Sequence, residues 1–590
     1  MAANGVSGKA FDIPLFKRIM AYVKPYKKVF YFTSALSIVL AFMAWVRPVL
    51  IQITIDENIK AFDKEGLLKM TFILIGVLLV ESVLEYFFSY LSSLLGQNVI
   101  RDLRNQVFKH VISFKLKHFD NTPIGQLVTR TVSDIETIAE MFSGGVLVII
   151  GDLLKIFTII TYMLIKQWDL ALITLIPIPI LFFATSIFKK VIKKAFQEVR
   201  EQVSVMNTFV QEHITGMSIV QIFNRETVEM DRFSDINKKH RSAHIKTVWA
   251  YSVFFPIVEM LSAGSIALLV WYGFKEVAEQ HATPGVIFSF ILFIYMLYRP
   301  IRQLADRFNT LQMGMVSSER VFKVLDTQST IENNGTLKPT DLTGNIEFKN
   351  VWFAYNEEEW VLKDISFQIK KGESLALVGA TGAGKSSIIN LLGRYYEINK
   401  GEISIDGINI NDFDLAHLRK IMSIVLQDVF LFSDTIYNNI TLYSKDITKE
   451  EVINGAKKIG AHAFIMELPN GYDYNVKERG ALLSVGQRQL ISFIRAYVHQ
   501  PEILILDEAT SSIDSDSETL IQHATDVITK DRTSIIVAHR LSTIKNASKI
   551  LVIEKGEIVE SGNHNELIQK KGYYKKLYDY QFKNQVEEAQ

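Results

Sequence analysis

The part of the chain before residue 307 contains apolar stretches close to the length of a helix that crosses a bilayer. They predict six membrane-spanning helices, near residues 29–54, 67–96, 139–165, 168–190, 248–273 and 284–306. After residue 345 the pattern changes, because short apolar runs there alternate with helical patterns, as is typical of an α/β domain. We therefore predict a membrane α-helical bundle fused to a water-soluble α/β domain.

Two long polar segments between the predicted spans, 97–138 and 191–247, keep a helical pattern and carry many lysines and arginines. Basic residues prefer the cytoplasmic side of a membrane. We therefore expect a multi-pass protein of the cytoplasmic membrane, with both termini inside and spans two to five continuing as long helices into the cytoplasm.

The organisation follows from these changes of pattern. Residues 11–26 have apolar positions at helical spacing with basic residues between them, which favours a helix lying on the membrane surface; an ordinary capping helix is the alternative. Threonine, asparagine, glycine and proline are frequent from residue 326, which predicts a linker. The predicted parts are an interfacial segment (1–27), a transmembrane domain (28–325), a linker (326–345), a nucleotide-binding domain (346–580) and a tail (581–590).

Composition excludes several classes of protein. Hydrophobic residues make up 48% of the chain and the mean hydropathy is +0.17, as expected for a protein that is half membrane-embedded. The net charge is +1, from 64 basic and 63 acidic residues, and no polybasic run stands out, so no nucleic-acid partner is expected. The chain has no cysteine, which excludes disulfides and thiolate metal sites.

Three acidic residues lie within the predicted spans. Glu81 and Glu85 are four residues apart, on one face of the second span, and Glu259 is in the fifth. Isolated charges in hydrocarbon are costly, so these side chains should face the bundle interior or water. They are candidates for a substrate cavity that attracts cations; the alternative is the wall of a hydrated cavity with no role in recognition.

The second half of the chain contains a glycine-rich loop, Gly379–Ser386. It follows the apolar run Leu375–Val378 and precedes the segment Ile388–Leu392, which is the strand–loop–helix context of a phosphate-binding P-loop. Its backbone N–H groups and the helix N-terminus would bind phosphate oxygens, Lys385 would reach the terminal phosphates, and the Ser386 hydroxyl would ligate Mg²⁺. The predicted ATP-binding residues here are Gly379, Ala380, Thr381, Gly382, Ala383, Gly384, Lys385, Ser386 and Ser387.

Two carboxylates follow another apolar run, Ile503–Leu506, which is typical of a buried parallel strand. Asp507 is suited to the Mg²⁺ shell, and Glu508 to a base that polarises the attacking water. A strand that ends in acidic residues is common by itself. Together with a P-loop, it predicts the catalytic half of an ATPase site.

Further motifs resemble those of one family, the ABC transporters. Leu483–Gln487 resembles the signature loop of ABC ATPases, and Glu478–Gly480 resembles the X-loop of the exporters. In the membrane half, Phe119–Gly125 and Glu212–Glu226 resemble the two coupling segments, and Tyr298–Pro300 resembles the end of span six. The resemblance covers nearly the whole chain and implies a half-transporter of the type I (type IV) exporter architecture.

The same resemblance implies roles for single residues. By it, Tyr355 stacks on adenine, Gln427 ligates Mg²⁺ and senses the membrane domain, Asp514 belongs to the D-loop, and His539 holds the γ-phosphate while Glu508 acts as the base. In this family two nucleotide domains enclose two ATP molecules, so one chain cannot complete a site. The signature residues that would face the partner's ATP are Ser484, Val485, Gly486 and Gln487.

Two positions depart from the family pattern. Val485 stands where the signature usually has glycine, and Lys477 stands where the X-loop usually has glycine, while the P-loop, Glu508 and His539 are intact. This combination resembles the glutamate-bearing chain of bacterial heterodimeric multidrug exporters. We therefore expect a partner that is a different half-transporter and lacks the catalytic glutamate. A homodimer that tolerates valine is the alternative.

The resemblance also implies the type of cargo. It favours ATP-driven export of hydrophobic or amphipathic compounds, often cationic, by alternating access, with ATP and Mg²⁺ as cofactors and membrane lipid around the spans. A homodimeric lipid flippase is the second hypothesis. A third, a regulatory or channel-like protein that binds ATP without pumping, is disfavoured by the intact Glu508.

Overall fold

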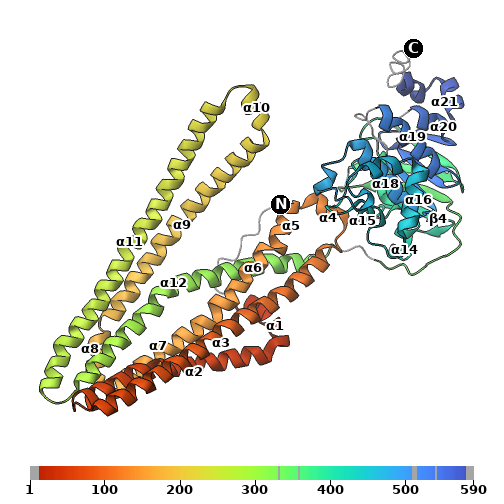
Figure 1. Ribbon diagram of the computed structural model, residues 1–590. Coiled ribbons are helices and arrows are strands. Elements are labelled where there is room, and N and C mark those ends of the chain that lie inside the picture. Colours follow the sequence, from red (N-terminus) through yellow and green to blue (C-terminus); the bar gives the residue numbers. More distant parts are fainter. Residues whose placement is uncertain (1–11, 330–332, 357–358, 508–514, 538–540, 580–590) are drawn as a thin grey trace. The chain divides into compact units, whose positions relative to one another are not determined.

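The computed structural model describes residues 12–329, 333–356, 359–507, 515–537 and 541–579 (Figure 1). These residues divide into two compact units. Residues 12–112 and 122–328 form the first, which we call the membrane unit. Residues 113–121 and 329–579 form the second, the nucleotide unit. The short segment 113–121 therefore belongs to the nucleotide unit, although it lies between helices of the membrane unit in the sequence.

Among the residues described, the membrane unit consists of helices joined by turns and contains no strand. Six of its helical stretches are long and apolar enough to cross a membrane: Lys24–Ile59, Lys64–Val111, Ile124–Lys166, Trp168–Thr215, Glu226–Ala278 and Pro284–Gln303. This confirms the predicted bundle of six spans. The helices are α1 (Ile13–Ala21), α2 (Lys27–Ile53), α3 (Lys64–Val111), α5 (Ile124–Thr131), α6 (Ser133–Glu140), α7 (Leu147–Lys166), α8 (Trp168–Leu175), α9 (Pro177–Thr215), α10 (Met217–Ile222), α11 (Glu226–Ala278) and α12 (Pro284–Asp326).

Several of these helices are much longer than a bilayer requires. The longest are α11 with 53 residues and α3 with 48, whereas about 20 residues suffice to span the hydrocarbon core. Figure 1 shows α9 and α11 side by side as a long hairpin closed at its tip by α10. Pro177 begins α9, and its fixed φ and missing N–H explain why α8 ends just before it.

The N-terminal helix α1 is fixed to the end of α12. Asp12 caps α1 by accepting a hydrogen bond from the backbone N–H of Leu15, at 3.1 Å. The guanidinium of Arg18 donates two hydrogen bonds to Asp326, at 2.6 and 2.7 Å, and lies 4.2 Å from the ring centre of Phe322. The first helix is thus held by a bidentate ion pair and a cation–π contact.

The nucleotide unit contains two sheets. A six-stranded sheet has the order β10-β9-β3-β8-β7-β6, and a four-stranded sheet has the order β2-β1-β4-β5. The strands are β1 (Ile346–Ala354), β2 (Trp360–Ile369), β3 (Ser374–Val378), β4 (Lys400–Ile405), β5 (Ile408–Asn409), β6 (Met422–Val425), β7 (Ile503–Asp507), β8 (Thr533–Val537), β9 (Lys549–Glu554) and β10 (Glu557–Gly562).

Helices complete the unit around these sheets. They are α4 (Leu116–Asn121), α13 (Lys385–Leu392), α14 (Leu415–Lys420), α15 (Ile436–Thr441), α16 (Lys449–Ile459), α17 (His462–Glu467), α18 (Val485–Val498), α19 (Ser515–Thr529), α20 (Leu541–Asn546) and α21 (His564–Lys570). With the membrane helices, this confirms the predicted fold class, a helical bundle fused to an α/β domain.

The parallel strands of the larger sheet are buried on both faces. Side chains alternate along β7, so Leu504 and Leu506 pack in one hydrophobic core while Ile503 and Ile505 pack in the other. The described core residues of β7 and β8 are almost completely inaccessible to solvent. Burial on both faces explains why these strands read as continuous apolar runs in the sequence.

A buried carboxylate ties α5 and α6 to α12. Asp134 accepts a hydrogen bond from Arg130, at 2.6 Å, and another from the Ser317 hydroxyl, at 3.1 Å. Its side chain is 7% exposed, and Arg320 approaches it to 3.7 Å. Removing one partner of such a buried pair leaves the other charge uncompensated.

We predict that Asp134→Ala lowers the stability of the membrane unit by about 3 kcal/mol, because Arg130 loses its partner. The measurement is thermal unfolding of the detergent-purified protein. Glu136→Ala is the matched control, because the Glu136–Arg104 pair is half-exposed and contributes less than about 1 kcal/mol. Equal unfolding temperatures for the two variants would contradict the assignment.

Candidate nucleotide site

The P-loop connects β3 to α13, as the sequence predicts. The ammonium group of Lys385 donates hydrogen bonds to the carbonyls of Gly379 and Ala380, at 2.8 and 2.9 Å, so the side chain curls back over the loop. Gly382 and Gly384 have φ values of +82° and +105°, a region that L side chains rarely adopt. The two glycines thus allow the turn that brings backbone N–H groups toward one centre.

Lys385 is buried, and Asp507 is the carboxylate whose charge acts on its ammonium group. Burial lowers the pKa of its ammonium group, and the carboxylate of Asp507 acts in the opposite direction. A phosphate would add negative charge beside the ammonium and would favour the protonated form in the same way. The site is therefore suited to an anion.

Three parallel strands carry the other predicted residues to the same edge of the sheet. Val425 of β6 is paired with Leu506 of β7, and Asp507 is paired with Val537 of β8. Gln427 therefore follows β6 close to the end of β7, where Asp507 lies. Because β8 also pairs with β3, the P-loop begins at this edge as well. Of the other predicted residues, Glu508, Asp514 and His539 lie outside the residues that the structure describes.

The residues at this edge fit a magnesium ion in their chemistry. Ser386 offers a hydroxyl, Gln427 an amide oxygen and Asp507 a carboxylate, and Mg²⁺ prefers oxygen ligands. Ser386 and Gln427 are exposed, and Asp507 is partly exposed.

Tyr355, predicted to stack on adenine, follows the last residue of β1. Its hydroxyl lies 3.0 Å from the Ser387 hydroxyl, and Asn390 donates a hydrogen bond to it at 3.4 Å. Its ring packs edge-on against Phe353 and Tyr396, with centroid distances of 4.7 and 4.9 Å. The structure thus brings Tyr355 to the first turn of α13, directly beside the P-loop.

The residues predicted to form the signature loop lie at the N-terminus of α18. Ser484 and Gln487 form a capping box, in which each side chain bonds to the backbone N–H of the other, at 3.2 and 3.0 Å. Val485 is the first residue of the helix and is 48% exposed, whereas Gly486 is buried. Val485 is not among the residues with positive φ, so the local backbone does not demand glycine there.

Lys477, at the predicted X-loop position, does have a positive φ, unlike Val485. Lys477 has φ +59° and ψ −171°, a conformation that is essentially restricted to glycine. The chain therefore keeps a glycine-like backbone at the position where the family usually has glycine. Strain of this kind is of order 1–3 kcal/mol.

Comparisons with known proteins agree with this geometry. A family model described as the ABC transporter transmembrane region matches residues 30–301, and one described as ABC transporter matches residues 362–511. The chain belongs to the ABC transporter family. It is a type IV-like half-transporter of the exporter group, a multi-pass membrane protein that binds ATP and couples its hydrolysis to transport.

Relatives of this transporter cover nearly its whole length. It is 38% identical over 589 residues to the "Uncharacterized ABC transporter ATP-binding protein YknV" of Bacillus subtilis, covering 99% of this chain and 98% of that protein. It is 35% identical over 596 residues to an "ATP-dependent lipid A-core flippase" of Syntrophus aciditrophicus, with 99% and 98% covered. The "Probable multidrug resistance ABC transporter ATP-binding/permease protein YheH" of Bacillus subtilis is 38% identical over 516 residues, with 86% and 76% covered.

Two of the three candidate acidic residues in the spans of the transporter have arginine neighbours. Glu81 of α3 lies 3.3 Å from the guanidinium of Arg47 in α2, and Glu259 of α11 lies 3.2 Å from that of Arg302 in α12. Glu85 is exposed. These pairs were not predictable from the sequence, because the partners are 34 and 43 residues away in the chain. The role of the three acids as a cavity lining stays a prediction.

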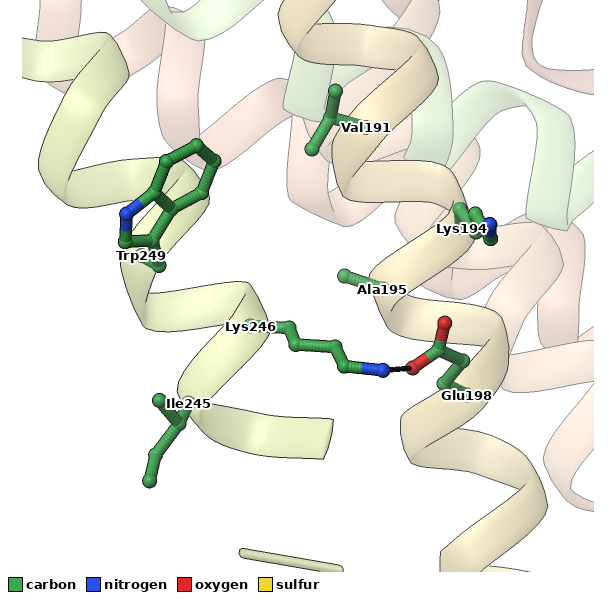
Figure 2. Close-up of a pocket in the computed structure, with 7 residues that line it drawn as sticks. All are labelled: Val191, Lys194, Ala195, Glu198, Ile245, Lys246 and Trp249. Atoms are coloured by element: carbon green, nitrogen blue, oxygen red, sulfur yellow. Dashed lines mark hydrogen bonds and ion pairs between the residues drawn. The ribbon is translucent and has the colours of Figure 1, made fainter. Parts of the chain in front are cut away.

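Figure 2 shows a pocket between α9 and α11 that contains none of the predicted site residues. Lys246 donates a hydrogen bond to Glu198 across it, at 2.5 Å, so these two charges offset each other. An exposed tryptophan, Trp249, lies on its α11 side. The complete lining is Val191, Lys194, Ala195, Glu198, Ile245, Lys246 and Trp249.

We predict that Lys385→Met reduces ATP affinity at least about tenfold, because methionine keeps the length of the side chain but cannot bind phosphate oxygens. Binding of a fluorescent ATP analogue to the purified transporter measures this. Lys371→Met is the matched control, since Lys371 is an exposed lysine in the turn before β3. An unchanged affinity in Lys385→Met would contradict the assignment of the P-loop.

Proposed function

We propose that this chain is one half of an ATP-driven exporter of hydrophobic or amphipathic compounds, often cationic, across the cytoplasmic membrane by alternating access. The observation that carries the proposal is the convergence of the P-loop, Gln427 and Asp507 at one sheet edge, in a chain that also contains six membrane spans. The basic segments 97–138 and 191–247 support cytoplasmic termini.

In the proposed cycle, the chain's own residues bind ATP and move one proton. The P-loop and Lys385 hold the phosphates, Tyr355 stacks on adenine, and Ser484 with the N-terminal N–H groups of α18 contacts the ATP of the partner. Glu508 accepts a proton from the attacking water, and His539 contacts the γ-phosphate. Magnesium, held by Ser386, Gln427 and Asp507, would neutralise phosphate charge.

ATP binding favours the closed pair of nucleotide domains because each ATP is then contacted from both sides. Hydrolysis removes the contact between γ-phosphate and signature loop and so removes the preference for closure. A ligand shifts a conformational equilibrium only by its difference in affinity for the two states. Closing and reopening would turn the membrane cavity alternately outward and inward.

A pocket between α2 and α7 supports a hydrophobic cargo or a lipid neighbour. Its aromatic residues include Trp45 and Tyr162, which stack with a centroid distance of 5.1 Å, together with Phe42 and Phe157. None of the three acidic residues of the spans lines this pocket. The Arg47–Glu81 and Arg302–Glu259 pairs mean that any attraction for cations must compete with an existing arginine.

A heterodimer is the assembly we propose. Transporters of this family work as dimers, and the altered signature at Val485 together with the intact Glu508 suits a chain that supplies the one competent catalytic base. Its partner would then carry an intact signature and lack the glutamate. Lys477, in a backbone conformation typical of glycine, is a second departure from the usual exporter pattern.

A homodimeric lipid flippase is the second candidate, and two observations favour it. Val485 is a normal helical residue with an exposed side chain, so its backbone N–H keeps the orientation that glycine would give. A relative of similar length is named as an ATP-dependent lipid A-core flippase. In this case both nucleotide sites would be equivalent.

We predict that Glu508→Gln abolishes steady-state ATP hydrolysis while ATP binding is retained, because the amide keeps the shape of the side chain but cannot accept the proton. Phosphate release and binding of a fluorescent ATP analogue measure the two properties. Glu502→Gln is the control, as Glu502 precedes β7 and is distant from its carboxyl end. Full hydrolysis by Glu508→Gln would mean that another group acts as the base.

The assembly is tested by purifying the chain alone and together with a second half-transporter that lacks the glutamate. A heterodimer predicts ATP turnover only in the co-purified sample, and loss of all turnover when Glu508→Gln is introduced. A stable, fully active homodimer would contradict the heterodimer and support the second candidate.

A further inference from the structure

The helix α4 lies on the nucleotide unit next to the residue predicted to bind adenine. The ammonium of Lys117 donates a hydrogen bond to the backbone carbonyl of Tyr355, at 2.8 Å. The hydroxyl of Tyr396 donates a hydrogen bond to the carboxylate of Asp120. A third contact, from Lys115 to Glu397 at 3.3 Å, reaches neither tyrosine.

These contacts fix both the backbone and the ring of Tyr355. Strand β1 ends at Ala354, so the backbone carbonyl of Tyr355 lies just beyond the strand. This carbonyl accepts its hydrogen bond from the ammonium of Lys117. The ring of Tyr396 is perpendicular to that of Tyr355, with an interplanar angle of 89°. Asp120 anchors the far end of the Tyr396 ring through its hydroxyl. The position of Tyr355 therefore depends on two side chains of α4.

The chain connects α4 directly to a membrane helix on each side. The helix α3 ends at Val111, α4 begins at Leu116, and α5 begins at Ile124, so α4 has only short links to two helices of the membrane unit. A displacement of the ends of α3 and α5 would reach Lys117 and Asp120 through these short links. Tyr355 would then shift relative to Ser387 and the P-loop, where its hydroxyl now lies.

We propose that Lys117 and Asp120 are positioning residues for the adenine-stacking surface of Tyr355, so that occupancy of the base pocket and the position of α4 are linked. The inference rests on the proposed function, in which Tyr355 stacks on adenine. Linkage between two sites is reciprocal: if the position of α4 changes the affinity for ATP, then ATP changes the preferred position of α4 by the same factor.

The test compares KM for ATP and kcat in the assembled transporter for Lys117→Met, Asp120→Ala and Tyr396→Phe. Each is expected to raise KM about threefold to tenfold, the effect of losing one charge-assisted hydrogen bond near the surface, and to leave kcat at saturating ATP within about twofold. Asp120→Asn should restore a KM close to that of the wild type, since its amide oxygen still accepts from Tyr396.

Lys115→Met is the matched control, because it removes a contact of the same segment that does not involve Tyr355 or Tyr396. Its KM should stay unchanged. An equal rise of KM in Lys115→Met would show general loosening of α4 and would overturn the inference. An unchanged KM in Lys117→Met, Asp120→Ala and Tyr396→Phe would overturn the inference as well. Tyr396→Phe and Asp120→Asn preserve shape, and their thermal unfolding should match the wild type.

Tyr355→Ala separates this inference from the function on which it rests. If Tyr355 stacks on adenine, Tyr355→Ala raises KM by itself, and adding Tyr396→Phe raises it no further, because the two act through one surface. If Tyr355→Ala leaves KM unchanged, the stacking role fails. If Tyr355→Ala raises KM and the α4 variants do not, only the positioning role fails.

Discussion

The parallel pairing of β3, β8, β7 and β6 is the constraint on which the nucleotide site depends. Parallel strands place their carboxyl ends at one edge, so segments that are far apart in sequence arrive at the same place. The P-loop, Gln427 and Asp507 meet for this reason. Parallel strands of this kind need cover on both faces of the sheet. The two hydrophobic cores, which receive alternate side chains of β7, provide it.

A second constraint is the cost of charge in hydrocarbon. It accounts for the pairing of Glu81 with Arg47 and of Glu259 with Arg302, since a paired acid is less costly to desolvate than an isolated one. The same pairs limit how strongly these acids could attract a cationic cargo. In the exporter that we propose, recognition of hydrophobic shape, as in the aromatic pocket beside Trp45, would then contribute more to cargo binding than charge.

Local sequence predicts most of this fold and much of the site. Apolar length predicts the six spans, and the run before Gly379 predicts β3 because a buried parallel strand is apolar on both faces. Contacts set by tertiary packing are not predictable in this way. Nothing in the spacing of Lys117 and Tyr355 indicates that they meet. The resemblance marks Lys477 as a departure from glycine, but only the structure shows that its backbone keeps a positive φ. The resemblance of Phe119–Gly125 to a coupling segment places it near the nucleotide domain without identifying its partners.

The most direct test of the account is ATP-dependent transport in inside-out membrane vesicles. Wild-type transporter, assembled with its partner, should accumulate a hydrophobic fluorescent cation when ATP is added, and vesicles with Glu508→Gln should not. Accumulation that persists in Glu508→Gln vesicles, or wild-type vesicles that hydrolyse ATP and move neither the dye nor a labelled lipid, would contradict an exporter driven by hydrolysis at this site.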